Sequence, residues 1–216
     1  MAFKLDYIAR KFGLTIIKSA GNNHNQKNPP FFGDSNLALN IINVGSTNPN
    51  GTVLSIFSDY EKNPKFLFTK EAPKPLVVAP GESYYNIRTK TYHNGTSYSA
   101  PLVTGTVSIL MKEFPQIREN PVAVMSVLAA SSLDIYSTEI NNNGLRYATG
   151  AGLLDYPMAR IASRNVEVKL VENNLSPGTQ LFESDCIILR EGEQLIASCS
   201  SLFNGAYVDT RESQYL

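Results

Sequence analysis

The chain has 216 residues, of which 43% are hydrophobic and 18% are charged, so a packed core is expected and an intrinsically disordered chain is excluded. Basic and acidic residues number 19 each, and this balance excludes the basic face that nucleic-acid binding requires. No apolar run approaches the roughly 20 residues of a membrane-spanning helix, so we expect neither nucleic acid nor a membrane segment among the partners.

The first elements are a helix and a short strand. Apolar residues recur at near-helical spacing over Phe3–Phe12, which predicts a helix. Leu14–Lys18 is mostly apolar and predicts a strand. It runs into Ser19, Ala20, Gly21 and Asn22, where glycine and asparagine favour a turn.

Two more strands follow, each closed by glycine or proline. We expect these strands within Asn40–Ser46 and Leu76–Gly81.

Ser97 opens the next helix. An apolar set follows it at the spacing of one helix face: Val103, Val107, Leu110, Met111 and Phe114. The free N–H groups and the positive dipole end at a helix start favour a developing negative charge. From these residues alone, Ser97 is either a nucleophile or an ordinary capping serine.

The rest of the chain changes once, after Arg164, from helical spacing of its apolar residues to alternation. Helices are predicted over Pro121–Leu133 and Tyr156–Ala162. The alternation of strands and helices predicts an α/β domain with a parallel sheet over residues 1–163. Beyond it, Val166–Leu170 and Ile187–Ile196 alternate and predict a partial β-rich domain over residues 164–216.

Several of these segments carry a family resemblance. Gly95–Gly105 resembles the nucleophile segment of subtilisin-like serine peptidases (subtilases), G-T-S-x-(A/S)-x-P-x-V-x-G, although Tyr98 is larger than usual and Leu102 replaces a common histidine. Ser19–Asn22 is similar to their A-G-N turn. Four further segments are similar to their I-x-V-G, A-x-F-S, V-x-A-P-G and G-x-G-x-(I/L)-(N/D) motifs: Asn40–Ser46, Ser55–Ser58, Leu76–Gly81 and Gly150–Asp155. The resemblance covers about residues 3 to 163.

The resemblance implies a fold, an activity and a site. The fold is a subtilisin-like parallel sheet flanked by helices, and the activity is proteolysis of a polypeptide through an acyl-enzyme. Ser97 is then the nucleophile, while the Asn22 side-chain amide and the Ser97 backbone N–H form the oxyanion hole. Ser19, Ala20 and Gly21 line the floor of the P1 pocket. The family also implies a secreted or cell-surface setting.

The other two members of the catalytic triad are missing from the sequence. Subtilases place the triad in the order Asp, His, Ser, but no D-(S/T)-G or H-G-T segment occurs here. The two histidines, His24 and His93, lack the family context of a catalytic base. We therefore expect a sheet that is incomplete at its N-terminal side, a chain that is inactive alone, and a missing upstream half as a partner.

No cofactor is expected. The loop from Asn22 to Gly33 offers polar oxygens of the kind that bind calcium in this family, but its spacing does not provide about six oxygen ligands. Cys186 and Cys199 are the only cysteines, and two cysteines do not decide between a disulfide and free thiols.

Two alternative functions stay open at this point. The first is a non-catalytic binding module that keeps the subtilase fold. The second is an unrelated hydrolase with Ser97 on a strand-to-helix elbow, but that motif, G-x-S-x-G, requires glycine where the chain has Ser99.

Overall fold

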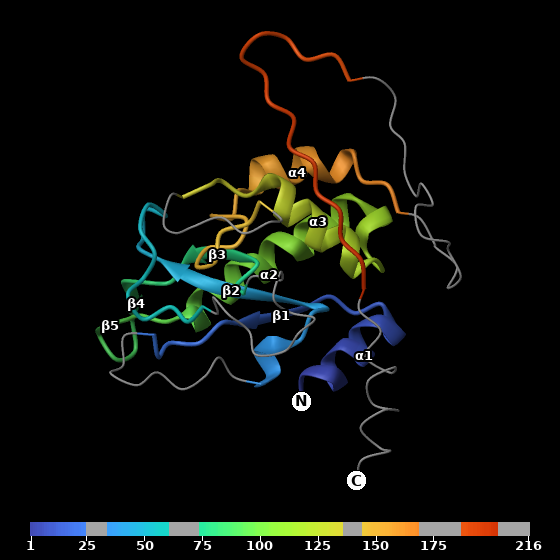
Figure 1. Ribbon diagram of the computed structural model, residues 1–216. Coiled ribbons are helices and arrows are strands. Elements are labelled where there is room, and N and C mark those ends of the chain that lie inside the picture. Colours follow the sequence, from blue (N-terminus) through green and yellow to red (C-terminus); the bar gives the residue numbers. More distant parts are fainter. Residues whose placement is uncertain (25–33, 61–73, 136–143, 169–186, 203–216) are drawn as a thin grey trace.

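The computed structural model is centred on a parallel sheet of strand order β1-β2-β3, with helices on both faces (Figure 1). The strands are β1 (Ile16–Ser19), β2 (Ile41–Thr47) and β3 (Val77–Pro80). This arrangement confirms the predicted α/β fold with a parallel sheet. The structure describes residues 1–24, 34–60, 74–135, 144–168 and 187–202.

Strand β2 lies in the middle of the sheet, and all seven of its residues are buried. Side chains of a strand alternate between its two faces. Accordingly, Ile42 and Val44 belong to the larger hydrophobic core, while Ile41 packs with Ala2 and Ala38 in a smaller core. Strand β1 lies at the edge, and no other described strand pairs with its outer side.

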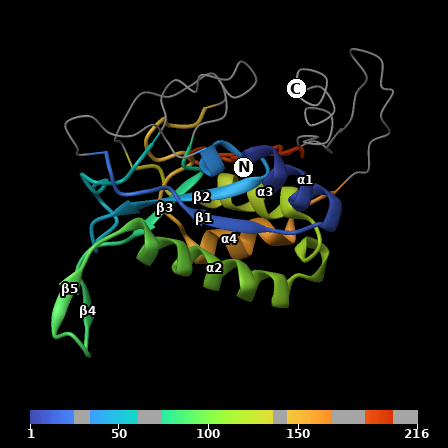
Figure 2. The ribbon, with the colours of Figure 1, turned by 90° about the horizontal axis from the view of Figure 1, so that it is seen from below.

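The larger core is covered by three helices: α2 (Thr96–Glu113), α3 (Pro121–Ser131) and α4 (Tyr156–Arg164). Helix α1 (Ala2–Phe12) and the short 3-10 helix η1 (Asp34–Leu37) lie on the opposite side of the sheet (Figure 2). The predicted inner face of α2 is confirmed, because Val103, Val107 and Leu110 are buried in the larger core.

Helix α1 turns a polar residue toward the sheet. Its buried residues are Ala2, Asp6 and Ala9, whereas its aromatic Tyr7 and Phe12 are exposed. Asp6 is held by Asn40, because its Oδ1 accepts the Asn40 backbone N–H at 2.7 Å and its carbonyl accepts the Asn40 side-chain amide at 2.9 Å. This long-range pairing orients the helix.

A buried lysine lies near Asp6. The Lys74 Nζ donates to the Ala38 carbonyl at 2.6 Å. Burial lowers the pKa of Lys74 to about 8, although the Asp6 charge opposes this effect.

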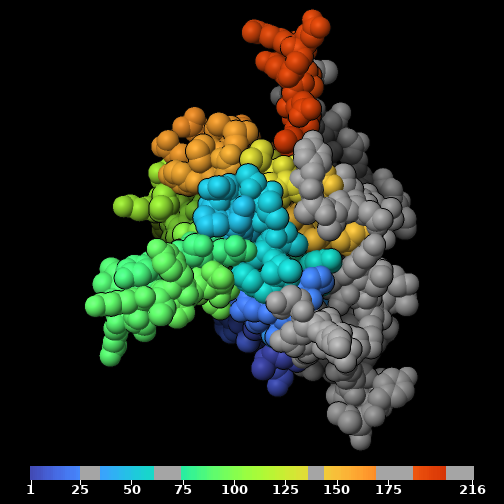
Figure 3. Space-filling model, turned by 90° about the vertical axis from the view of Figure 1, so that its left-hand side faces the viewer, coloured from blue at the N-terminus to red at the C-terminus, as the bar shows by residue number. Residues whose placement is uncertain are grey.

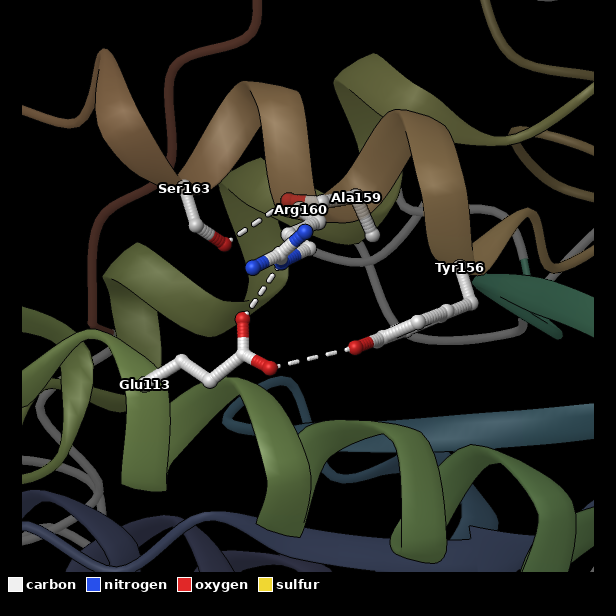
Figure 4. A network of polar contacts seen from close by, with 5 residues as sticks. All are labelled: Glu113, Tyr156, Ala159, Arg160 and Ser163. Carbon is white, nitrogen blue, oxygen red and sulfur yellow. Dashed lines mark hydrogen bonds and ion pairs between the residues drawn. The ribbon is translucent and has the colours of Figure 1, made fainter.

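Helix α4 is tied to α2 by polar contacts at the surface (Figure 4). Arg160 forms an ion pair with Glu113, and the Tyr156 hydroxyl donates to the other Glu113 oxygen at 3.3 Å. Glu113 and Arg160 are exposed, whereas Tyr156 is half-buried against the larger core, so we assign most of the stability of this contact to the core beneath it. Asp155 caps the start of α4, and its Oδ1 accepts the Met158 N–H at 2.9 Å.

The glycine-rich segment before α4 runs beside β3. The Val78 N–H donates to the Gly152 carbonyl, and the Leu154 N–H donates to the Val78 carbonyl, each at 2.9 Å. Gly152 has φ +119°, and a Cβ there would lie 2.1 Å from the Leu133 carbonyl oxygen. Glycine is therefore required where this segment passes Leu133.

The structure differs from the sequence prediction at two places. An unpredicted hairpin of β4 (Tyr84–Asn86) and β5 (Thr91–His93) projects from the body (Figure 3). The strands predicted after Arg164 are absent from the described residues 165–168 and 187–202, where Ile188 is 89% exposed. No described strand lies there to pair with them, and a single strand is not stable alone. The separate β-rich domain over residues 164–216 stays a prediction.

Within the described ranges, no helix has the length and apolar character needed to cross a membrane.

Candidate active site

Ser97 is the second residue of α2 and its side chain is exposed. Its backbone N–H belongs to the first helical turn, whose amides have no partners within the helix. Neither this N–H nor the Ser97 hydroxyl has a hydrogen-bond partner among the described residues. The helix start thus offers a free donor and an unbonded hydroxyl at one residue.

The chain reaches Ser97 through two closely packed glycines. The Gly95 N–H donates to the Gly81 carbonyl at 2.8 Å, directly before the helix. A Cβ at Gly81 would lie 2.3 Å from the Ser46 Oγ and 2.4 Å from the Ser99 Oγ. Glycine at position 81 therefore allows the start of α2 to approach β2.

Asn22 contacts the residue that precedes Ser97. Its Oδ1 accepts the Thr96 backbone N–H at 2.8 Å and the Thr96 hydroxyl at 2.9 Å. The same hydroxyl accepts the Gly21 N–H at 3.2 Å. Because the amide oxygen is occupied, the Asn22 Nδ2 is left as a donor, and it has no partner within the described part of the chain.

Ser97 also lines a groove of about 680 Å³ between β1 and α2. One wall consists of Ile17, Lys18 and Ser19, and the other of Ser97, Ala100, Pro101, Thr104, Gly105 and Ser108. Of the three predicted floor residues, Ser19 lines the groove, whereas Ala20 is fully buried. The Ala20 carbonyl accepts the Asn36 side-chain amide at 2.6 Å. This bond holds the backbone of the turn in place.

Neither histidine contacts Ser97 within the described residues. The His93 Nε2 hydrogen-bonds with the Thr91 hydroxyl at 2.9 Å. The His24 ring lies against the Tyr60 ring, with 4.2 Å between their centroids. Neither histidine is therefore placed as a general base for Ser97 in the described part of the chain.

Sequence reasoning missed two residues at this site. Thr96 lies inside the nucleophile segment Gly95–Gly105, so the motif that indicated Ser97 could also have indicated Thr96. Asp59 directly follows the Ser55–Ser58 turn, and its Oδ1 accepts the Asn23 N–H at 2.8 Å. No local pattern in the sequence indicates this contact.

The described ranges contain no group of three or more His, Cys, Asp or Glu side chains that could hold a metal ion. Most of the loop considered for calcium, residues 25–33, lies outside them, and so does Cys186. Cys199 is exposed.

Comparison with known proteins gives concordant results. The family model of the subtilases (peptidase S8) matches residues 1–152. Fervidolysin from Fervidobacterium pennivorans is 27% identical over 165 residues, covering 69% of this chain and 22% of that protein.

Solved structures share the fold. The self-cleaved protease domain of PatA has a TM-score of 0.56 at 19% identity, covering 77% of this chain and 56% of that one. The crystal structure of fervidolysin, described as a keratinolytic enzyme related to subtilisin, has a TM-score of 0.53 at 24% identity, covering 73% and 24%. The chain thus spans between about a fifth and three fifths of the length of these relatives.

Proposed function

The chain belongs to the subtilase family, and on this basis we propose that it supplies the nucleophile and oxyanion-hole half of a subtilisin-like serine endopeptidase. Ser97 attacks the scissile carbonyl of a polypeptide and carries the acyl group. The Asn22 Nδ2 and the Ser97 backbone N–H donate hydrogen bonds to the oxyanion of the tetrahedral intermediate.

One observation carries this proposal. Thr96 occupies the Asn22 side-chain oxygen through two hydrogen bonds, which leaves the Asn22 nitrogen as a donor next to the start of α2. The second donor, the Ser97 N–H, lies one residue further along the same helix. Donors that are fixed before the reaction need no reorganisation when negative charge develops, and this is the main source of such stabilisation.

The substrate side chain before the scissile bond is proposed to lie along Ser19, Ala20 and Gly21. Ser19 lines the same groove as Ser97. Ala20 and Gly21 contribute through their backbone, which the Asn36 amide and the Thr96 hydroxyl hold in place.

The general base and its aspartate come from a partner segment, the upstream half of the peptidase domain with its D-(S/T)-G and H-G-T motifs. Two features of the structure support this part of the proposal. The outer edge of β1 is unpaired within the described residues, and a strand edge is a template for another strand. Helix α2 also has two exposed apolar side chains, Leu102 (39% exposed) and Ile109 (47% exposed). They lie on a side of the helix that a partner could cover.

A reconstitution experiment tests the proposal. The chain is assayed against a fluorogenic peptide alone, and again after co-expression with a segment that carries the two missing motifs. Turnover only in the complex, and its loss in Ser97→Ala, supports the two-part enzyme. Turnover by the chain alone that disappears in Ser97→Ala means that this chain contains its own base. A stable complex without turnover favours the non-catalytic binding module.

A further inference from the structure

Asp59 holds the chain on both sides of Asn22. Its Oδ1 accepts the Asn23 N–H at 2.8 Å, and its own N–H donates to the Gly21 carbonyl at 3.0 Å. The two residues that flank Asn22 are thus both bonded to one aspartate. The His24 N–H, one residue later, donates to the Phe57 carbonyl at 3.2 Å and continues this attachment.

The segment that carries Asp59 is itself anchored to β2. The Ser58 Oγ accepts the Ser46 backbone N–H at 3.0 Å, and the Ser55 N–H donates to the Ser46 carbonyl at 2.9 Å. The hydroxyls of Ser46 and Ser55 lie 2.8 Å apart and share a further hydrogen bond. All three serines are buried, so the position of Asp59 is tied to the central strand of the sheet.

The Asp59 carboxylate also packs closely against the turn. Gly21 has φ +121°, and a Cβ there would lie 2.1 Å from the Asp59 Oδ2. Burial raises the pKa of the Asp59 carboxyl, while the Asn23 hydrogen bonds and the nearby His24 act in the opposite direction. The carboxyl therefore fills the space over Gly21 as a bonded group and not as a freely solvated one.

We propose that Asp59 is a positioning residue, which fixes the Gly21–Asn23 turn so that the Asn22 amide is aimed at the oxyanion before substrate arrives. Its effect on catalysis rests on the function proposed above, whereas the clamp itself is a property of this chain. Asp59 does not line the groove that contains Ser97. A negative charge near an oxyanion is unfavourable, so Asp59 acts through hydrogen-bond geometry and not through its charge.

Hydrogen exchange tests the clamp without any need for activity. Exchange is followed by mass spectrometry over Ser19–His24 in Asp59→Ala and Asp59→Asn. The alanine variant loses the acceptor for the Asn23 N–H, so exchange there becomes about ten- to hundredfold faster. The asparagine variant keeps an acceptor oxygen and retains the protection. The control is Asp155→Ala, which removes a similar bond to the Met158 N–H at the start of α4.

Kinetics in the reconstituted enzyme tests the consequence for catalysis. Asp59→Ala lowers kcat about tenfold with KM within twofold, and Asp59→Asn restores kcat. If Asp59→Ala does not fold, Asp59→Asn still tests the proposal. A tenfold loss of kcat in Asp59→Asn would mean that the charge of Asp59 acts on catalysis, and this result would overturn the proposal. Exchange in Asp59→Ala that rises evenly along the chain also overturns it. Absence of turnover in every complex counts against the proposed function, while the exchange result still decides the clamp.

Discussion

The Thr96 hydroxyl links Asn22 to the start of the nucleophile helix, since it donates to the Asn22 Oδ1 at 2.9 Å and accepts the Gly21 N–H at 3.2 Å. Thr96 is itself fully buried. One hydroxyl therefore couples two segments that lie 74 residues apart in the chain. Through this contact, α2 determines both the position of Ser97 and the orientation of the Asn22 amide.

Replacing Thr96 tests this coupling. Valine has nearly the same shape but no hydroxyl, so Thr96→Val leaves the Gly21 N–H without its acceptor, at a cost of about 1–3 kcal/mol. We expect a kcat about tenfold lower in the reconstituted enzyme, measured with a fluorogenic peptide. Thr96→Ser keeps the hydroxyl and serves as the control. Equal kcat values for the valine and serine variants would mean that the hydroxyl does not orient Asn22.

Removing the proposed oxyanion donor gives a larger effect. In the reconstituted enzyme, Asn22→Ala should lower kcat by about 10²–10³ with little change in KM, the loss established for the corresponding asparagine of subtilisin. KM changes little because the hydrogen bond forms mainly in the transition state. The control is Asn165→Ala, an exposed position just beyond α4. An unchanged kcat in Asn22→Ala removes this residue from the mechanism.

Much of the fold up to Arg164 could be predicted because its elements are short, apolar and closed by glycine or proline. The segments Asn40–Ser46 and Leu76–Gly81 contain the observed strands β2 and β3 almost in full. The start of α2 at Thr96 likewise agrees with the prediction that Ser97 lies at a helix N-terminus.

Contacts between distant residues could not be predicted in this way. The inward side of α1 depends on Asp6 and Asn40, which lie 34 residues apart. The clamp on the Asn22 turn depends on Asp59, which lies 36 residues from Asn23. Periodicity reports which residues share a face of one element, but it contains no information on which polar groups meet across the fold.

The buried Lys74 gives the chain a stability that rises with pH. Its pKa is lowered by burial to about 8, from 10.5 in the unfolded chain. Between these values the unfolded state binds more protons, so this group adds stability as the pH rises from about 8 to 10.5. A shift of this size corresponds to about 3 kcal/mol over the whole window.

Urea unfolding of the wild type and of Lys74→Met at pH 7, 8.5 and 9.5 measures this effect. Methionine has a similar length but does not titrate, so the titrating groups that do not interact with Lys74 cancel in the difference between the two proteins. We expect the wild type to gain about 1–2 kcal/mol over the variant from pH 7 to 9.5. Parallel pH dependences for the two proteins would show that Lys74 titrates as an exposed lysine.

A substitution at Gly105 tests where the proposed partner segment binds. It should stabilise the isolated chain but weaken the binding of the partner segment. Gly105 lies inside α2, is exposed, and a Cβ there would meet no atom within 4 Å. Alanine in a helix interior is about 1 kcal/mol more favourable than glycine. The isolated Gly105→Ala chain should therefore melt several degrees higher.

In the proposed complex we expect the same methyl group to obstruct the upstream half, since Gly105 lines the groove beside Ser97. A covered helix has no room for an added side chain, and overpacking costs about 1–3 kcal/mol. Gly105→Ala should thus weaken binding of the upstream half about 5- to 100-fold, as measured by titration calorimetry. The control is Thr106→Ala, which also favours the helix but does not line the groove. A higher melting temperature together with unchanged binding would place the partner elsewhere than on this face of α2.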